Sequence, residues 1–205
     1  MTGTREKLIA GALQVLRTKG IAGVSARGIA AAAQANQALV FYHFGSVDDL
    51  LAAACRSSAE ARVADYRDRF SEVDSLSALL ELGGEIHAAE REAGNVAVLA
   101  QLLAGGQSGS VLSGPTAGGL ALWTAEVEQV LHRVLADSPL LRLVDPHGMA
   151  TLISATFIGV ELVEGVDPAA ATNATTTLER LGELLTLLDG PLAKTVLRHA
   201  TRKLA

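Results

Sequence analysis

The chain has 205 residues, 49% of them apolar and 19% charged, and it carries a formal net charge of −5. This composition excludes a disordered chain, and the absence of an uncharged apolar run of about 18 residues argues against a transmembrane helix. Cys55 is the only cysteine, which excludes an intramolecular disulfide. Because the first residues also lack the apolar core of a signal peptide, we expect a cytoplasmic protein with no membrane partner.

The charge is unevenly distributed along the chain. Residues 1–50 hold five Lys or Arg against three Asp or Glu, whereas residues 51–205 hold twelve against nineteen. The N-terminal end is therefore mildly basic and the remainder acidic. This asymmetry favours a small phosphate-binding head on an acidic body.

An amphipathic helix opens the chain. Apolar residues recur at three- and four-residue spacing from Leu8 to Leu16, and the predicted helix begins at Thr4 and ends at Gly20. Its apolar face needs a cover, which the following helix pair can supply. The first three helices therefore predict a compact three-helix head.

Two short helices around a tight turn come next. Ser25 has the hydroxyl typical of a helix N-cap, and Asn36 is placed to cap the following helix, Gln37 to Phe44. Three of the seven aromatic residues of the chain lie in this last helix, and we assign two of them, Phe41 and Phe44, to the core. The pattern is typical of a helix-turn-helix, whose second helix enters the DNA major groove.

The rest of the sequence predicts helices only. Ser46 and Asp49 have the spacing of a capping box ahead of a long helix. Two Asp-Pro pairs, at 145–146 and 167–168, place Asp at the cap and Pro at the first helical position. The glycine-rich stretch 105–119 interrupts the helical pattern. The fold is therefore predicted to be all-α with about nine or ten helices, those of the body covering 46–70, 75–93, 95–104, 116–136 or 119–136, 146–164, 168–189 and 191–204.

The head is similar to a known family. Residues 4–51 resemble the N-terminal DNA-binding domain of TetR-family transcriptional regulators. The resemblance implies a helix-turn-helix domain at residues 1–46 and a ligand-binding and dimerisation domain at residues 47–205. It also implies three partners, namely double-stranded DNA, a small-molecule effector and a second copy of the chain. Besides the first helix, it rests on Gly20-Ile-Ala-Gly-Val-Ser25, Arg27, Ile29-Ala30, Ala33, Leu39-Val-Phe-Tyr-His-Phe44, Ser46 and Asp49-Leu50-Leu51.

The chain departs from the family pattern in three ways. Gln34 stands in the turn where family members often have glycine, so the turn is either slightly strained or differently shaped. Val47 replaces a lysine that many members have, which removes one phosphate contact. The recognition helix also has no Arg or Lys. Affinity must then come from polar side chains, backbone amides and dimerisation.

The resemblance implies a set of DNA-contacting residues in the head. Gln37 can read an adenine edge or hold a phosphate, and Ala38 or Leu39 can touch a thymine methyl. Each residue also has a plain structural reading, such as capping for Ser25 or aromatic packing for Tyr42. The full predicted set is Ser25, Arg27, Gln37, Ala38, Leu39, Tyr42 and His43.

Apolar residues at helical spacing mark two further candidate sets in the body. The predicted ligand-binding residues, which ordinary core packing also explains, are Ile86, Glu90, Leu99, Leu102, Leu103, Trp123, Val127 and Phe157. The resemblance implies a four-helix bundle between two copies, and intramolecular burial is the alternative. The predicted dimer-interface residues are Thr156, Val160, Val163, Leu178, Leu181, Leu185 and Leu188.

The sequence holds no set of residues for catalysis. The glycine-rich stretch lacks the Gly-Lys-Ser/Thr ending of a phosphate-binding loop and the spacing of a nucleophile elbow. The histidines are scattered, so we predict no metal and no cofactor. The preferred hypothesis is a ligand-responsive repressor released from a pseudo-palindromic operator by a small apolar or amphipathic molecule. The alternatives are a ligand-independent helix-turn-helix protein and, less favoured, a helical enzyme.

Overall fold

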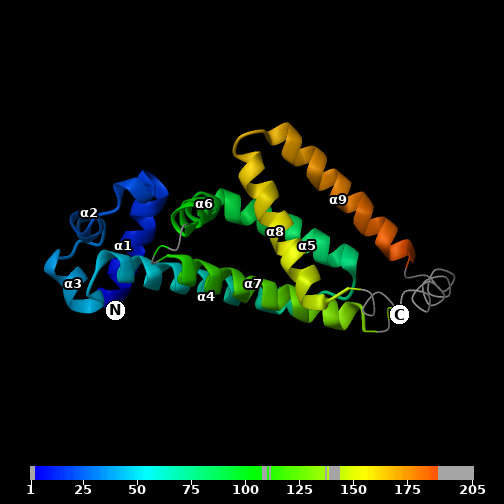
Figure 1. The fold of residues 1–205 in the computed structure, drawn as a ribbon, viewed down its shortest axis with the longest axis horizontal. Helices are drawn as coiled ribbons and strands as arrows, with labels where there is room; N and C mark the ends of the chain where they lie inside the picture. Colours follow the sequence, from blue (N-terminus) through cyan, green and yellow to red (C-terminus); the bar gives the residue numbers. More distant parts are fainter. Residues whose placement is uncertain (1–2, 108–109, 111, 137, 139–143, 189–205) are drawn as a thin grey trace. The chain divides into compact units, whose positions relative to one another are not determined.

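The computed structural model describes residues 3–107, 110, 112–136, 138 and 144–188, and the side chains of 185–188 are left out. Within these residues every regular element is a helix, and no strand occurs (Figure 1). The elements are α1 (Thr4–Lys19), the 3₁₀ turn η1 (Ile21–Gly23), α2 (Ala26–Ala32), α3 (Ala38–Phe44), α4 (Val47–Glu72), α5 (Leu76–Glu92), α6 (Asn95–Gly105), α7 (Ser113–Val134), α8 (Pro146–Glu164) and α9 (Pro168–Leu188).

The chain divides into two compact units, each built from two segments. The first unit comprises residues 1–64 and 90–122, and the second comprises residues 65–89 and 123–205. Helices α4 and α7 each contribute residues to both units. These contact-based units differ from the predicted functional domains, residues 1–46 and 47–205, and that functional division stays a prediction.

The core of the first unit forms around α1. Leu8, Ala12 and Leu16 are almost completely buried on one face of this helix, where they meet Ile29 of α2. Close packing of the two helices depends on Gly11, because a Cβ there would lie 2.9 Å from the Ile29 carbonyl oxygen. The core also takes in apolar residues of α3, α4 and α6 and the residue just before α7, including Val40, Leu50, Leu51, Ala54, Val98, Leu102 and Leu112.

The caps predicted for the head are confirmed. The Ser25 hydroxyl accepts a hydrogen bond from the Gly28 amide at 3.1 Å, and the Asn36 side chain accepts one from the Ala38 amide at 2.8 Å. Ser46 accepts from the Asp49 amide at 3.0 Å and fixes the start of α4. Of the two alternatives for the turn, the structure shows the strained one, because Gln34 has a φ of 51°. This is a left-handed conformation that costs a non-glycine residue about 1 kcal/mol.

The second unit has its own core. Leu131 of α7 and Leu135, just after its end, are buried together with Ala150 of α8. At its edge the indole of Trp123 lies against the rings of Tyr66 and Phe70, with ring centroids 5.9 and 6.3 Å apart. The guanidinium of Arg133 donates to the backbone carbonyls of Phe70 and Val73 at 2.6 and 3.0 Å. These bonds tie α7 to the end of α4 and to the residue that follows it.

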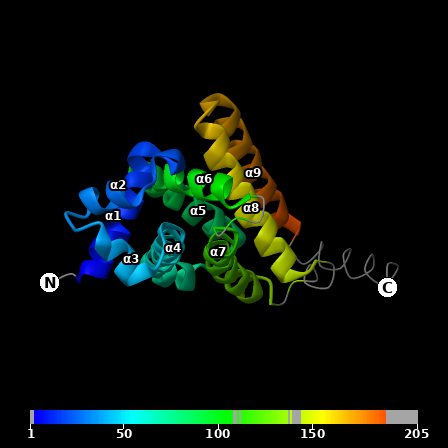
Figure 2. The same cartoon turned by 60° about the vertical axis from the view of Figure 1, so that its left-hand side comes forward.

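Helices α8 and α9 begin at the two Asp-Pro pairs, as predicted. Asp145 accepts from the Gly148 amide at 2.7 Å, and Asp167 accepts from the Ala170 amide at 3.0 Å. The two helices are neighbours joined by a short turn, and they diverge from this turn in Figure 1 and overlap in Figure 2. Helix α9 also approaches α5 closely, because a Cβ at Gly182 would collide with the Leu80 side chain.

One predicted helix boundary is wrong. Helix α7 begins at Ser113, whereas the sequence predicted a start at Thr116 or Gly119. Three glycines of the glycine-rich stretch 105–119 therefore lie inside α7. The first turn tolerates Pro115 because that turn needs no amide donor, and Gly119 packs close to the Ala59 methyl of α4. The final predicted helix, 191–204, lies outside the described residues.

Candidate functional site

The recognition helix α3 has one buried side and one exposed side. Val40 is completely buried, and Leu39 and Phe44 pack against the core of the first unit. The opposite side carries four exposed side chains, which we call the recognition-helix face. They are Gln37, Ala38, Phe41 and Tyr42.

The sequence predicts that Phe41 and Phe44 are core residues, and the structure contradicts the first prediction and confirms the second. Phe41 was assigned to the core, but 49% of it is exposed. Val40 and Phe44, one helical turn apart, take the core side, so the ring of Phe41 turns outward between Gln37 and Tyr42. The assignment of Phe44 to the core is confirmed, since it packs there partly buried.

Five of the seven predicted DNA-contacting residues are exposed, namely Ser25, Arg27, Gln37, Ala38 and Tyr42. Ser25 and Arg27 are exposed at the start of α2, where the Ser25 oxygen also caps the helix. Tyr42 is 82% exposed, and its ring stands edge-on to that of His43 at 5.0 Å between centroids. Only Leu39 of the predicted set is turned substantially toward the core. Arg5 lies over the Phe44 ring at 5.0 Å and adds a positive charge behind α3.

A chain of polar contacts ties the head to α6 within the first unit. Arg17 at the end of α1 donates to the Asn95 side-chain oxygen at 3.1 Å, and Asn95 donates to Glu90 at 2.8 Å. Glu90 in turn lies 3.8 Å from the guanidinium of Arg62 on α4. A second link runs from the Ile21 amide to the Gln101 side chain at 3.1 Å. Glu90, a predicted ligand-binding residue, is therefore engaged by α4 and α6.

The remaining predicted ligand-binding residues fall into two groups. Leu102 is buried in the core of the first unit, and Leu99 and Leu103 of the same helix are half-buried. Ile86 and Val127 are buried in the second unit, with Trp123 and Phe157 at the edge of the same cluster. The structure thus brings four of the eight residues together in that cluster: Ile86, Trp123, Val127 and Phe157.

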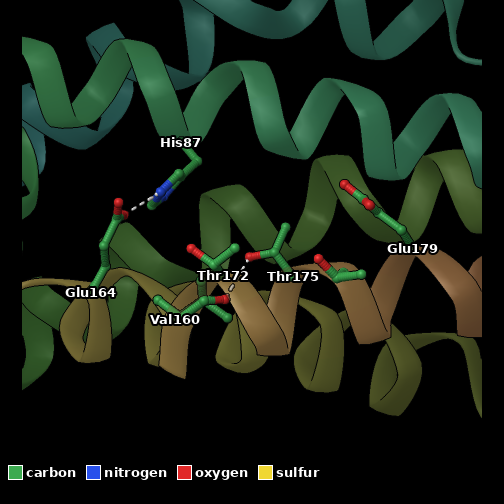
Figure 3. Close-up of a pocket in the computed structure, with 8 residues that line it drawn as sticks. His87, Val160, Glu164, Thr172, Thr175 and Glu179 are labelled. Atoms are coloured by element: carbon green, nitrogen blue, oxygen red, sulfur yellow. Dashed lines mark hydrogen bonds and ion pairs between the residues drawn. The ribbon is translucent and has the colours of Figure 1, made fainter. Parts of the chain in front are cut away.

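A groove of about 280 Å³ lies between α5, α8 and α9 in the second unit (Figure 3). Its lining combines carboxylates and hydroxyl groups with a small apolar part formed by Val160 and Ala171. Val160 is the only member of the predicted sets in it, and it was predicted for the dimer interface. The lining residues are His87, Val160, Glu164, Ala171, Thr172, Thr175, Thr176 and Glu179.

His87 links two helices across this groove. Its Nδ1 lies 2.6 Å from the Glu161 carboxylate. Its Nε2 lies 2.5 Å from the Glu164 carboxylate, the contact that Figure 3 marks with a dashed line. With Glu161, Glu164 and Glu179 the site holds three carboxylates beside one imidazole, so the groove is acidic. The sequence signal was weak, because His87 and Glu161 are 74 residues apart.

The outer surface of α8 and α9 is apolar and exposed. Leu152 is 66% exposed and Val163 43% on α8, and Leu181 is 50% exposed on α9. Gly159 shares the stripe of Leu152 and Val163, and a Cβ there would meet nothing within 4 Å. We call this surface the α8–α9 face. Its exposed aliphatic residues are Leu152, Leu162, Val163, Val166, Leu181 and Leu184.

The predicted dimer residues relate to this face in different ways. Val163 and Leu181 belong to it, whereas Thr156 and Leu178 are half-buried and Val160 lines the groove. The side chains of Leu185 and Leu188 lie outside the described residues. By length and composition α8 is apolar enough to cross a membrane, and so is the bent pair of α3 and α4 if counted as one span. Only 11% of the apolar window of α8 is buried, and its Glu161 carboxylate lies against His87.

The family model of bacterial regulatory proteins of the TetR family matches residues 8–54. The match covers α2, α3 and most of α1 and extends into α4. A solved TetR-family member from Streptomyces coelicolor A3 is 28% identical, with a TM-score of 0.64 over 88% of this chain and 98% of that one. Residues 8–54 therefore form a TetR-type regulatory domain, and the fold of the described chain is that of TetR-family regulators.

Two further solved structures resemble this chain over both the head and the body. The multidrug-binding protein EbrR, solved with imidazole, is 27% identical, with a TM-score of 0.64 over 88% of this chain and 96% of that one. The fatty acid degradation regulator FadR from Bacillus halodurans is 16% identical, with a TM-score of 0.69 over 88% and 95%, and it shares the fold. A comparison with curated protein sequences gave no match.

Proposed function

We propose that this regulator is a homodimeric repressor, released from a pseudo-palindromic operator when a small effector binds. The proposal rests on the combination of two exposed faces in one chain. The recognition-helix face carries no cation, and the α8–α9 face is aliphatic. Because phosphate neutralisation dominates affinity for DNA, one such head binds weakly. Two heads on one dimer gain the effective concentration that a single head lacks.

The dimer contact is assigned to the α8–α9 face. Leu152, Gly159 and Val163 follow one another at helical spacing, and the open space at Gly159 lets a partner helix approach closely. Leu181 and Leu184 supply the matching surface of α9. Two such helix pairs, one from each copy, make a four-helix bundle with a continuous apolar seam.

The DNA contact is assigned to the predicted residues of the head. Gln37 and Ala38 face the base edges, while Tyr42, His43, Ser25 and Arg27 hold the phosphate backbone. Exposure of Tyr42 and of the start of α2 supports these roles. The two α3 helices of a dimer then enter successive major grooves, ~34–36 Å apart or a multiple of that spacing.

The effector is assigned to the groove between α5, α8 and α9. The groove is lined by the carboxylates of Glu164 and Glu179 beside the His87 side chain, so it favours a positive charge. Val160 and Ala171 offer a small apolar surface beside it. An amphipathic molecule with a cationic end fits this lining, and the similarity to EbrR, a multidrug-binding protein solved with proflavin, supports that class.

The response requires that the effector bind one conformation of the regulator more tightly than the other. Helix α5 carries His87 of the groove and, three residues or about one turn later, Glu90 of the polar chain to Asn95 and Arg17. A shift of α5 therefore acts on the contacts that hold α1 against α6. The head spacing that matches the operator is the property we expect to change.

The dimer is tested with the double variant Val163→Glu plus Leu181→Glu, by light scattering and by fluorescence anisotropy with operator DNA. We expect a monomer that keeps its helicity and binds DNA more than a hundredfold more weakly, because carboxylates cannot be buried in an apolar seam. Ala125→Glu plus Gln129→Glu changes two exposed positions of α7; because it replaces Gln129 and Ala125 by glutamate, it adds the same two charges and is the control. A variant that stays dimeric contradicts the assignment of the interface.

The effector response is tested by titrating the DNA complex with proflavin and with hexanoate. Proflavin is expected to release the DNA and hexanoate to leave it bound, and Glu164→Gln should weaken the proflavin response. If neither this cation nor a wider panel of amphipathic cations and neutral molecules moves the melting temperature or the DNA affinity, the ligand-independent alternative is supported instead.

A further inference from the structure

The recognition-helix face has an unusual chemical inventory for a surface that meets DNA. Its four side chains, Gln37, Ala38, Phe41 and Tyr42, present an amide, a methyl group, a phenyl ring and a phenol. It has no guanidinium, ammonium or carboxylate group. Nearly half of Phe41 is exposed, although its neighbour Val40 is completely buried.

Base edges in the major groove call for different partners. Guanine is read chiefly by Arg or Lys, and cytosine by Asp or Glu, none of which the face contains. Adenine is read by the amide of Gln or Asn, and the thymine methyl by apolar groups such as those of Ala or Phe. The inventory therefore matches A·T pairs and lacks the groups for G·C pairs.

We propose that Phe41, with Ala38, packs on thymine methyl groups and that Gln37 reads an adenine edge, so that the operator half-site is centred on A·T pairs. The inference rests on the DNA-binding role proposed for the head and adds the class of sequence that the head selects. Phe41 is thereby assigned as a specificity-determining residue.

The helix geometry places these groups together. Gln37 and Phe41 are four residues apart and Ala38 and Phe41 three, so their Cβ atoms lie about 5–6 Å from one another on one helix face. This is between one and two base-pair steps of ~3.4 Å, so the three side chains reach neighbouring pairs. Leu39, Val40 and Phe44 anchor the helix from behind, which fixes where the Phe41 ring points.

The physical consequence is a readout that depends on apolar burial. Covering a methyl group gains about 0.8 kcal/mol, which is about fourfold in affinity. This gain is not screened by salt, in contrast to phosphate contacts. A dimer that covers one thymine methyl in each half-site gains about fifteenfold from the two methyls together.

The test starts with selection of binding sequences from a random double-stranded library by the full-length protein. We expect enriched half-sites centred on A·T pairs. The enriched operator is then synthesised with deoxyuridine in place of single thymidines, which removes only the 5-methyl group. Wild-type affinity should fall about fourfold for each methyl at the central positions, as measured by fluorescence anisotropy.

Two variants attribute the effect to Phe41. Phe41→Ala should bind thymidine and deoxyuridine operators with equal affinity, whereas Tyr42→Phe should weaken binding to both operators by the same factor. Circular dichroism checks that each variant keeps its helicity. Equal affinity of the wild type for the two operators, or methyl sensitivity that survives in Phe41→Ala, overturns the inference.

The selection also separates this inference from the proposed function. A defined consensus centred on G·C pairs would overturn the A·T readout while leaving a sequence-specific DNA-binding regulator. Enrichment of no sequence at all would contradict the DNA-binding role itself, and the inference with it.

Discussion

The recognition-helix face and the α8–α9 face both expose apolar side chains, but their chemistry differs. The first mixes one aromatic hydrocarbon, Phe41, with amide and phenol groups on a seven-residue helix. The second has aliphatic side chains, among them Leu152 and Leu181, on helices of 19 and 21 residues. A mixed face suits base edges and phosphates, whereas a long aliphatic face suits another helix pair.

The difference shows that exposure alone does not identify an interface. Phe41 at 49% and Leu181 at 50% are almost equally exposed. Their neighbours decide the partner, because Tyr42 and Gln37 supply hydrogen-bonding groups beside Phe41, while Leu184 extends the apolar surface beside Leu181. If the comparison holds, changes in the first face alter DNA affinity and changes in the second alter association.

The largest expected effect tests the recognition-helix face directly. Tyr42→Ala combined with His43→Ala should weaken operator binding about a hundredfold, because each head loses two contacts worth about 0.5–1.5 kcal/mol each. Dimerisation and helicity should be unchanged, by light scattering and circular dichroism. Unchanged operator affinity in an anisotropy titration would mean that Tyr42 and His43 do not contact DNA. It would also contradict the assignment of the recognition-helix face to DNA binding.

The next effect separates the two sides of α3. Val40→Ala should lower the free energy of unfolding by about 2 kcal/mol, because it deletes two completely buried methyl groups and leaves a cavity. Phe41→Ala, one position along and half exposed, is the matched control and should cost much less. Urea denaturation of both variants measures the difference, and equal losses would mean that Phe41 is a core residue after all.

A smaller effect concerns the turn ahead of α3. Gln34→Gly should raise the free energy of unfolding by up to about 1 kcal/mol, because glycine adopts the φ of 51° without steric cost. Thermal denaturation should show a higher melting temperature with operator affinity preserved. Ala35→Gly, which lacks a positive φ, should be destabilising and serves as the control.

The smallest effect lies at the start of α8. The Glu128 carboxylate, 2.8 Å from His147, raises the pKa of this imidazole above its ordinary value of 6.5, with Asp145 adding to the effect. The folded state therefore favours the protonated form, so the stabilisation is complete below pH 6.5 and is lost as the pH rises through the folded-state pKa. His132 also lies near Glu128, at 3.7 Å.

The measurement is the pH dependence of the melting temperature from pH 5 to 9, for the wild type and for His147→Gln. The difference between the two curves should shrink as the pH rises. A difference that is constant with pH would show that the contact between His147 and Glu128 does not distinguish the protonation states.

Short-range rules explain what the sequence could predict. The caps Ser25, Asn36 and Ser46 act within three residues of their own position, so their roles were visible before the structure. The two Asp-Pro starts were visible for the same reason. Phe41 was assigned wrongly because composition marked it as core, and only the packing of Val40 and Phe44 shows that the core side of α3 was already filled.

The groove could not be predicted, because its parts come from distant segments. His87 meets Glu161 only when α5 and α8 pack together, and no spacing in the sequence encodes that contact. The start of α7 was missed for a related reason. Glycines that weaken a helix locally are accepted where a neighbour such as Ala59 needs the space.

The composition of the first core has a consequence for modularity. Leu50 and Ala54 of α4, with Val98 and Leu102 of α6, are buried in the same cluster as the helices of the head. A fragment that stops after α3 would expose that cluster to water. Chimeras that exchange DNA-reading heads between relatives should therefore carry α6 with the head, and the portable part of this regulator is two stretches of chain rather than one.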